Sequence, residues 1–437
     1  MKTRNVAIIG GGISGLLCAY YLKKNGIAAQ IFESSDRLGG WIRSEIQMDC
    51  ILEWGPHTLL ADEDWKNLIE DLNIPTLPLK RSAQDRFIYR DGRLVKLPEG
   101  LLQFFFSDIL TVKGRLLLLS KVLTTRRELP EDETIREFFT PFIGKEAMNT
   151  LVDPFVRGIF AGSAHELSAA ATFSELFQRV KSKSSFWKAL RAPPRRAKRK
   201  SVGFKGGMEQ VARILEMNLS LPARRNCKIL GIEETQDRQI LVSTSQGKEC
   251  YSDVVVCTPA FVAADLLKTF LSDSSGKFLR EGIPYQQVGL WNLIFKRESM
   301  MRSGFGMLVP THEVYPIAAS LWASEIFEGK CDPHKFVASQ FFIGSQIPKN
   351  ATENIFNETL GSLKRLIGIK GEPIYSEYRT YSNAIPQPQV GHAKNLQEVL
   401  KNLPKEILLC GNYFYGPGLK DVLQKAKGIA SQITRSP

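Results

Sequence analysis

Apolar and polar positions at the start of the chain follow two different periods. The pattern of a short buried strand at residues 5–9 gives way to a helical pattern over 13–24, which ends just before Gly26. A second apolar run at 28–32 has the length of a strand. We therefore predict that the chain opens with a β-α-β unit.

The middle of the chain has a mainly helical pattern. Between about 60 and 177, apolar-rich segments are clearest at 101–123 and 133–143, and they predict a separate helical unit. Residues 179–205 are rich in Lys and Arg, lack acidic side chains and predict a mobile loop. This loop is either a solvated surface without a partner or a site for anionic lipid headgroups. Nucleic acid is a weaker candidate, because few aromatic residues are interleaved.

The second half of the chain returns to strands and helices. A helix is predicted over 208–218, sheet-forming segments occupy 285–345, and the C-terminus reads strand, glycine turn and helix. Further strands are predicted at 227–233, 240–244 and 251–257. We therefore predict an α/β fold.

Composition and charge narrow the class of protein. The 437 residues are 43% hydrophobic and 24% charged, typical of a folded protein with more than one domain. The net charge of +13 favours an anionic partner such as membrane lipid, nucleic acid or a polycarboxylate ligand. No apolar run reaches the length of about 18 residues that predicts a membrane-spanning helix.

The cysteines indicate no obvious site. There are seven of them, scattered and without a C-x-x-C pair, so neither a disulfide framework nor a zinc site is indicated, and a reducing compartment is expected. They lie at positions 18, 50, 227, 250, 257, 331 and 410.

A glycine-rich turn separates the first strand from the first helix. Its spacing is G-x-G-x-x-G, which permits a tight turn, close approach of a pyrophosphate and close packing of helix on strand. Glu33, at the end of the second strand, is placed to bind ribose hydroxyls. An apolar run after Lys2 and Arg4 also imitates a secretory signal, but the glycines favour the dinucleotide turn. The turn comprises Gly10, Gly11, Gly12, Ile13, Ser14 and Gly15.

The next segments resemble the flavin-dependent amine oxidase superfamily. Arg37-Leu38-Gly39-Gly40-Trp41 follows the acidic residue as it does in that superfamily, and Glu53-x-Gly55-Pro56 resembles its next flavin-contacting turn. Near the C-terminus, Gly411-Asn412 and then Gly416-Pro417-Gly418-Leu419 open a helix whose N-terminus would stabilise negative charge on a reduced flavin.

Within this superfamily the chain is most similar to the protoporphyrinogen oxidase family, from residue 5 to about 432. The stretches that carry this resemblance are 38–44, 152–162, 304–310 and 384–387. The resemblance implies a discontinuous Rossmann-like FAD-binding domain, an α+β substrate-binding domain and a helical membrane-binding insert. The implied FAD domain comprises 1–60, 200–275 and 395–437, the substrate domain 61–95 and 276–394, and the insert 96–199.

The family resemblance also implies the site residues and the reaction. The implied reaction is the oxidation of a porphyrinogen to a porphyrin in haem biosynthesis, with O2 or another molecule as the electron acceptor. FAD carries the hydride chemistry of this reaction, so no catalytic side chain is expected. Gly158 and Phe160 are expected at the substrate, whereas Arg157 is either a substrate contact or a structural ion-pair residue. The residues expected at FAD are Gly10, Gly11, Gly12, Ile13, Ser14, Gly15, Glu33, Ser34, Arg37, Gly39, Gly40, Trp41, Gly55, Pro56, His57, Thr58, Cys227, Asn412, Pro417, Gly418 and Leu419.

One departure from the family leaves the substrate open. Where family members often carry an arginine for a substrate propionate, this chain reads His57-Thr58-Leu59-Leu60. Protoporphyrinogen IX and coproporphyrinogen III therefore both remain candidate substrates. An amine oxidase, a carotenoid desaturase and a flavin-free binding protein are the competing functions. Peripheral attachment to the inner face of the cell membrane, a cytoplasmic location, a homodimer and no nucleic-acid partner complete the expectations.

Overall fold

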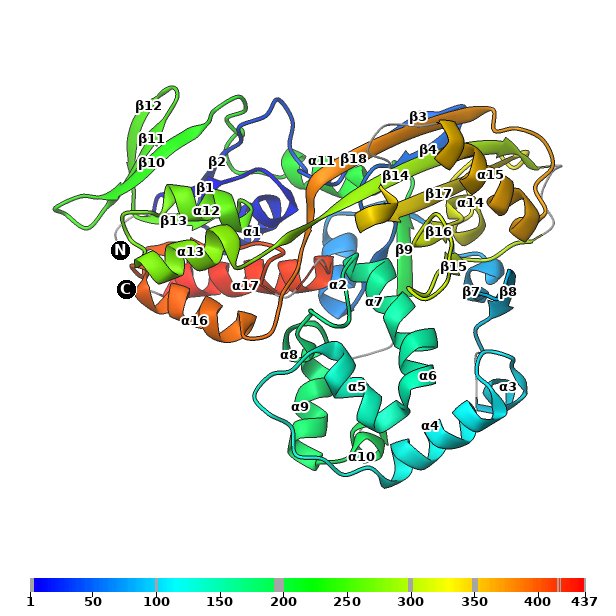
Figure 1. Cartoon of the computed structure of the whole chain (residues 1–437). Helices are drawn as coiled ribbons and strands as arrows, with labels where there is room; N and C mark the ends of the chain where they lie inside the picture. The colour runs from blue at the N-terminus through cyan, green and yellow to red at the C-terminus, as the bar shows by residue number, and fades with distance from the viewer. Residues whose placement is uncertain are drawn as a thin grey trace.

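The computed structural model of the chain describes residues 4–98, 101–191, 200–297, 302–347, 353–414, 416 and 418–435. Their helices and strands form three parts (Figure 1). One part is an α/β layer structure that carries both ends of the chain, and the second is built on a large mixed sheet. The third is a group of helices that projects away from the other two.

A parallel sheet with the strand order β19-β13-β1-β2 forms the centre of the first part. The strands β1, β2 and β13 are buried along their whole length, and β19 is buried except for the half-buried Leu408, which explains their nearly continuous apolar sequences. Alternate residues of β1 (Val6–Ile9) face opposite cores: Ile8 packs with α1 (Ile13–Lys24), and Ile9 packs with the helices and strands of the other face. Both faces of the sheet are therefore covered, as in a doubly wound fold.

Helices α1 and α17 (Leu419–Arg435) lie side by side on one face of this sheet (Figure 1). The remaining elements of this part are β2 (Ala29–Phe32), α2 (Glu63–Asp71), α11 (Glu209–Met217), β10 (Ile229–Glu234), β11 (Ile240–Thr244), β12 (Gly247–Tyr251), β13 (Asp253–Val256), α12 (Ala260–Leu266), α13 (Asp273–Glu281), α16 (His392–Asn402) and β19 (Ile407–Leu409). The predicted opening β-α-β unit is confirmed, and α1 has the predicted bounds.

The second part is a sheet with the order β18-β14-β17-β16-β15-β7-β8. Its longest strands, β14 (Tyr285–Lys296) and β18 (Tyr375–Pro386), pair antiparallel, and α15 (Glu353–Ile367) contributes to the core on one face. Its other elements are β7 (Arg86–Arg90), β8 (Arg93–Lys96), β15 (Gly306–Leu308), β16 (Ala319–Leu321), α14 (Ala323–Ile326), β17 (Lys335–Ile343) and two short 3-10 turns at Arg81–Gln84 and Gly344–Gln346.

Short strands connect the first two parts. They are β3 (Ser44–Gln47), β4 (Cys50–Glu53), β5 (Leu59–Ala61), β6 (Thr76–Leu77) and β9 (Lys200–Phe204), of which β3 pairs with β4, and β9 lies between β5 and β6.

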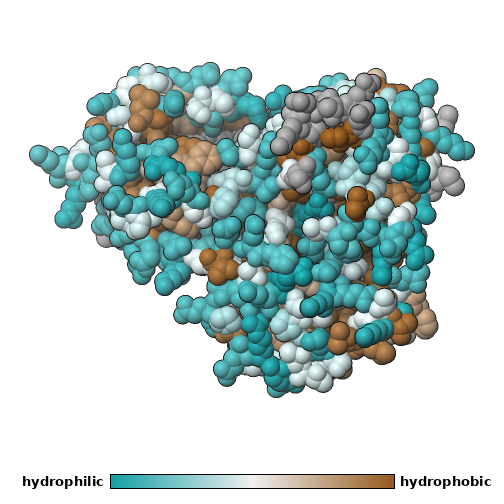
Figure 2. All heavy atoms as spheres, viewed as in Figure 1, coloured by the Kyte–Doolittle hydropathy of each residue, from teal (hydrophilic) through white to brown (hydrophobic). Residues whose placement is uncertain are grey.

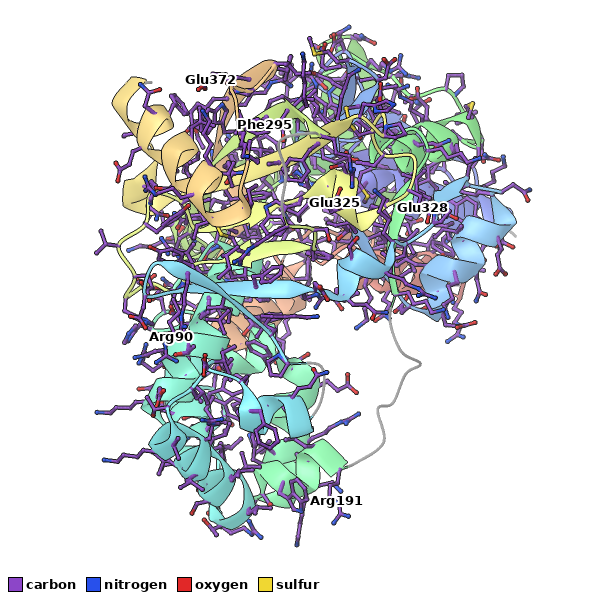
Figure 3. The ribbon with its side chains drawn as sticks, turned by 90° about the vertical axis from the view of Figure 1, so that its right-hand side faces the viewer. Arg90, Arg191, Phe295, Glu325, Glu328 and Glu372 are labelled. Carbon is purple, nitrogen blue, oxygen red and sulfur yellow. A yellow bond between two sulfur atoms is a disulfide. The ribbon has the colours of Figure 1, made fainter. Side chains whose placement is uncertain are left out.

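The helical part has its own core, rich in phenylalanine. Helix α5 (Ile135–Ile143) begins at a capping box in which Thr134 and Glu137 satisfy each other's backbone N–H groups. Arg90 connects this part to β7, because its guanidinium donates to the carbonyls of Asp108 at 3.1 Å and Ile109 at 2.6 Å (Figure 3). The other elements are α3 (Leu101–Phe106), α4 (Val112–Thr124), α6 (Lys145–Ala147), a π-helical turn at Met148–Val152, α7 (Asp153–Phe160), α8 (Ala169–Thr172), α9 (Ser174–Lys183) and α10 (Phe186–Arg191).

None of the helices in the described ranges has the length and apolar character needed to cross a membrane.

Two predictions of secondary structure are wrong. The region from 60 to 177 is not mainly helical throughout, because β5 to β8 occupy much of its first part. The basic region 179–205 is largely regular, since α9, α10 and β9 cover all of it except a few linking residues and 192–199, which lie outside the described residues. Apolar positions at helical spacing, such as the buried Val180 in α9, explain how a basic segment packs as a helix.

The structure also pairs two cysteines. Cys50 in β4 and Cys331 form a disulfide across a separation of 281 residues, so the expectation of a chain without disulfides is wrong for this pair. Their backbones meet as neighbouring antiparallel segments, which brings the two side chains together.

Helix α2 packs with the α/β part. Its Trp65 and Leu68 lie in the same core cluster as α1 and α17. The family resemblance assigns residues 61–95 to the substrate-binding domain, and these domain limits remain a prediction.

Candidate functional site

The glycine-rich turn between β1 and α1 has the geometry that its sequence predicts. Gly10 has a φ of +103°, which favours glycine. A Cβ at Gly15 would overlap the carbonyl oxygen of Gly10, so helix and strand could not pack as closely. Gly12 differs, because a Cβ there would have only one described neighbour, the Cα of Gly40 at 4.0 Å. The backbone at Gly12 therefore has space beside it for a ligand, next to Ile13 and Ser14 at the helix N-terminus.

Glu33 lies beside this turn, directly after β2. Its carboxylate accepts the Gly11 N–H at 2.7 Å and the Ser35 N–H at 2.8 Å, and Ser34 donates its hydroxyl at 3.3 Å. The backbone N–H of Cys227 donates to the Glu33 carbonyl at 2.9 Å. The structure thus brings the predicted acidic residue, Ser34 and Cys227 to the glycine turn.

The second glycine pair packs against the first. The Gly39 N–H donates to the Gly11 carbonyl at 2.9 Å, and Gly40 has a φ of +58°. Arg37 donates its guanidinium to the carbonyls of Leu38 at 3.1 Å and Ile42 at 3.3 Å. In this structure Arg37 therefore stabilises the turn, and its predicted contact with the cofactor remains a prediction.

The Gly55-Pro56 turn packs against the segment that follows the second glycine pair. A Cβ at Gly55 would overlap the Trp41 carbonyl, and the Trp41 ring is half exposed with its edge against Tyr381. These contacts place the three predicted cofactor turns in one continuous surface.

His57 is buried behind the Gly-Pro turn, and Thr58 follows it half-buried. The Nδ1 of His57 lies 3.0 Å from the Gly55 carbonyl, so Nδ1 carries the proton and donates. Nε2 is then an acceptor, and it has no partner among the described residues. Burial, with a smaller effect of the Lys330 charge, lowers the pKa of His57 to about 3, so the ring is neutral.

Thr258 is a residue that the sequence did not single out. It follows β13 beside Gly10, and its buried hydroxyl has no partner among the described residues. The unpartnered atoms of Thr258 and His57, with the space at Gly12, fit a dinucleotide cofactor in this surface. A signal in the sequence could have identified Thr258. It follows a predicted strand, and in a parallel sheet the end of that strand lies at the same edge as the glycine turn.

The C-terminal turn contacts the residue predicted at the substrate. Gly416 has a φ of +91°, and a Cβ there would lie 3.1 Å from the Phe160 ring. Gly418 and Leu419 lie at the start of α17, with Asp421 in its first turn, and Asn412 is half-buried. The predicted Pro417 lies outside the described residues.

Gly158 and Arg157, on α7, both contact the large sheet. A Cβ at Gly158 would overlap the Leu308 side chain of β15. Arg157 donates to the Val309 carbonyl at 3.2 Å and to Gln346 Oε1 at 2.6 Å, and burial lowers its pKa. These hydrogen bonds join Arg157 to neutral groups, and both of its predicted roles, a substrate contact and a structural ion pair, remain predictions.

A buried ion pair fixes the cofactor turns to the sheet. Glu53, at the end of β4, pairs with Lys330 and accepts the Met208 N–H at 3.1 Å, and its carbonyl accepts from Asn292 at 2.9 Å. Lys330 was not identified from the sequence, because no local pattern connects it with Glu53.

Comparison with known proteins gives one consistent result. The family model of flavin containing amine oxidoreductases matches residues 13–434. Protoporphyrinogen oxidase of Nicotiana tabacum mitochondria is 28% identical, over 98% of this chain and 93% of that protein. Coproporphyrinogen III oxidase of Bacillus subtilis is 24% identical, over 98% and 97% respectively.

A solved structure from Exiguobacterium sp. 255-15, named for protoporphyrinogen oxidase, has the same fold. The two structures superpose with a TM-score of 0.82 at 23% identity, over 99% of each chain. The fold, the three glycine turns and the match of the family model agree. The chain therefore belongs to the flavin containing amine oxidoreductase family, and it is an oxidoreductase with FAD as its cofactor.

Proposed function

We propose that this flavoprotein oxidises protoporphyrinogen IX to protoporphyrin IX in haem biosynthesis and passes the electrons to O2. One observation supports this most strongly. Leu308, Ala319 and Phe341 lie opposite one another on three adjacent strands, so their side chains share one face of the sheet. Leu308 packs on Gly158 at one end of this apolar row, and Phe341 packs on His57 at the other.

The row suits a flat, largely apolar substrate. A tetrapyrrole presents a broad apolar face, and contact with apolar side chains provides most of the binding energy for such a ligand. Phe160 and Gly416 connect the Gly158 end of the row to the C-terminal turn, so a substrate on this surface would lie next to the cofactor turns.

Bound FAD supplies the acceptor for hydride from the substrate carbon. The protein groups position the reactants. Gly12, Glu33 and the Gly39-Gly40 pair would hold the dinucleotide. The neutral His57 keeps its proton on Nδ1 and offers Nε2 as an acceptor for an N–H group on the ligand. Arg157 would keep β15 in place under the macrocycle.

The relatives support a porphyrinogen substrate, and coproporphyrinogen III is the second candidate. The Nicotiana tabacum protein is named for the first substrate and the Bacillus subtilis protein for the second, at similar identities to this chain. The two substrates differ in the number of carboxylates that the protein must bind. At the position where the family often has a cation for a carboxylate, this chain has His57 to Leu60, which provide none, so this position does not distinguish the two substrates.

The test compares both substrates directly. Protein purified in mild detergent should show flavin absorbance and should produce porphyrin fluorescence in air faster from protoporphyrinogen IX than from coproporphyrinogen III. Faster reaction of coproporphyrinogen III would select the second candidate. Flavin absorbance without porphyrin from either substrate, under air or with a quinone acceptor, would reject a porphyrinogen oxidase.

We also propose that the helical part attaches to the cytoplasmic face of the cell membrane. Exposed apolar side chains gather over α3 and α4 (Figure 2), where basic residues accompany them. Arg191 of α10 lies at the end of this part farthest from the sheet, with its guanidinium over Trp187 (Figure 3). Apolar and basic groups together suit the interface of an anionic membrane. The exposed apolar residues include Phe106, Val112, Leu116, Leu117, Leu123 and Leu190.

Co-sedimentation with liposomes tests this attachment. Binding should increase with the fraction of anionic lipid, and Leu116→Glu in α4 should weaken it, whereas Leu230→Glu on the exposed surface of β10 should not. Equal sedimentation with and without liposomes at every composition would contradict the proposal.

A further inference from the structure

Three cysteines that lie far apart in the sequence meet in the α/β part. The sulfur atoms of Cys18, Cys257 and Cys410 all lie within 4.8 Å of one another. Cys18 and Cys410 are completely buried, and Cys257 is partly exposed. This cluster lies outside the disulfide, and none of the three residues has a role in the site described above.

The topology explains why these thiols converge. Cys257 follows β13 and Cys410 follows β19, and these two strands are parallel neighbours whose carboxyl ends lie at the same edge. Helix α1 begins at that edge and carries Cys18 over it. Three independent elements therefore supply one thiol each, which is a defined arrangement rather than a property of one flexible segment.

The separations suit a shared metal ion. Sulfur ligands at about 2.3 Å from one ion lie about 3.8–4.0 Å from each other, so small side-chain rotations would bring this cluster into coordination. Thiolates are soft ligands that select ions such as Cu(I) or Zn(II). Among the described residues no fourth His, Cys or carboxylate ligand joins the cluster, whereas structural Zn(II) sites have four ligands.

A basic side chain lies beside the cluster. Lys425 of α17 is half-buried near Cys410 and Cys18 and interacts electrostatically with both. Three thiolates around a monovalent ion carry a net negative charge, and a nearby ammonium group offsets part of it in an apolar core. Of the three cysteines, Cys257 is the one that is partly exposed.

We propose that Cys18, Cys257 and Cys410 form a three-thiolate site for Cu(I), separate from the flavin chemistry. Binding releases the thiol protons to solvent as the three sulfur–copper bonds form, and no redox step is involved.

The test uses FAD-loaded full-length protein under anaerobic conditions, with its free thiols reduced and the Cys50–Cys331 disulfide intact. After incubation with Cu(I) and passage over a desalting column, elemental analysis should find about one copper per chain. X-ray absorption should show a shell of sulfur ligands only. Cys18→Ala should lose the retained copper, and the control Cys250→Ser, at an exposed cysteine outside the cluster, should keep it.

A second variant covers a failure of Cys18→Ala to fold. Cys257→Ser changes a partly exposed position and should also lose copper while retaining FAD absorbance and the thermal midpoint of the metal-free protein. Equal copper retention in the wild type and a folded cluster variant would overturn the proposal. Retention of Zn(II) in preference to Cu(I) would overturn the assignment of the ion.

Discussion

Glu53 and Lys330 form an ion pair in which each residue is 1% exposed. Glu53 lies two residues before the Gly55-Pro56 turn, and it also accepts the Met208 N–H. A charge left alone in such a place is strongly destabilising, because the protein cannot solvate it. The pair therefore connects the position of the cofactor turn to the integrity of the sheet.

We expect Lys330→Met to lower the free energy of unfolding by about 3–5 kcal/mol, since it leaves the Glu53 carboxylate without its partner. Thermal unfolding followed by flavin release measures this loss. Glu398→Gln removes the exposed partner of Lys401 and should cost less than about 1 kcal/mol. Equal effects of the two substitutions would contradict the importance of the buried pair.

Gly12→Ala separates cofactor binding from folding. A Cβ at Gly12 meets no described atom closer than 4.0 Å, and the φ of −66° suits alanine, so the apoprotein should fold normally. The added methyl group would occupy the space where the pyrophosphate approaches, and we expect FAD binding to weaken at least about tenfold. Flavin content after dialysis and circular dichroism of the apoprotein measure the two properties.

The control for this variant is Gly428→Ala in α17, where no described atom lies within 4 Å of an added Cβ. It should keep FAD and be slightly more stable, because alanine favours helix. Normal FAD content in Gly12→Ala would show that the cofactor does not approach this backbone.

Local patterns in the sequence predict the parts of the site that depend on short separations. The helical pattern over 13–24 predicts α1 with its observed bounds, and the Gly11 contact with Glu33 follows from the adjacency of β1 and β2. A strand-helix-strand unit brings the glycine turn and the acidic residue together through its own short connections, independently of the rest of the chain.

Contacts across long separations could not be predicted in the same way. Lys330 and Glu53 are 277 residues apart, and nothing near either residue identifies the other. The strands β7 and β8 were also missed, because a pair of short strands within a long helical pattern has too few alternating positions to be recognised. Their place depends on pairing with β15, from another part of the chain.

The disulfide gives a prediction about stability. Because Cys50 and Cys331 close a loop of most of the chain, replacing Cys331 with Ser should lower the free energy of unfolding by about 2–4 kcal/mol. Thermal unfolding with and without reductant measures this. The reductant should destabilise the wild type and have no further effect on Cys331→Ser; a wild type that does not respond to reductant would show that the pair is not oxidised.

His57 predicts a pH dependence of stability. Burial lowers the pKa of His57 from its ordinary value of 6.5 to about 3, so the folded protein keeps the ring neutral where the unfolded chain binds a proton. Stability should therefore be lost as the pH falls from about 6.5 towards 3, by up to about 1.4 kcal/mol per pH unit. Burial also lowers the pKa of His392, which adds a loss of the same sign.

His57→Asn should reduce this slope, and the exposed control His165→Asn should leave it unchanged. The free energy of unfolding in urea at a series of pH values between 4 and 7 measures the slope. An unchanged slope in His57→Asn would mean that His57 titrates normally in the folded protein.

Gly158→Ala tests the proposed substrate surface. A methyl group at residue 158 would overlap a terminal methyl group of Leu308. That end of the Leu308 side chain is flexible and can move aside without disturbing the backbone. The displaced Leu308 would enter the apolar row that it shares with Ala319 and Phe341, so the effect should fall on the substrate. We expect KM for the porphyrinogen to rise about tenfold, equivalent to about 1.4 kcal/mol, with FAD content and thermal midpoint nearly unchanged.

Gly276→Ala in α13, where an added Cβ meets no described atom within 4 Å, is the matched control and should keep the wild-type KM. If Gly158→Ala also keeps the wild-type KM, the substrate does not bind along this row, and the proposed function loses the observation on which it depends.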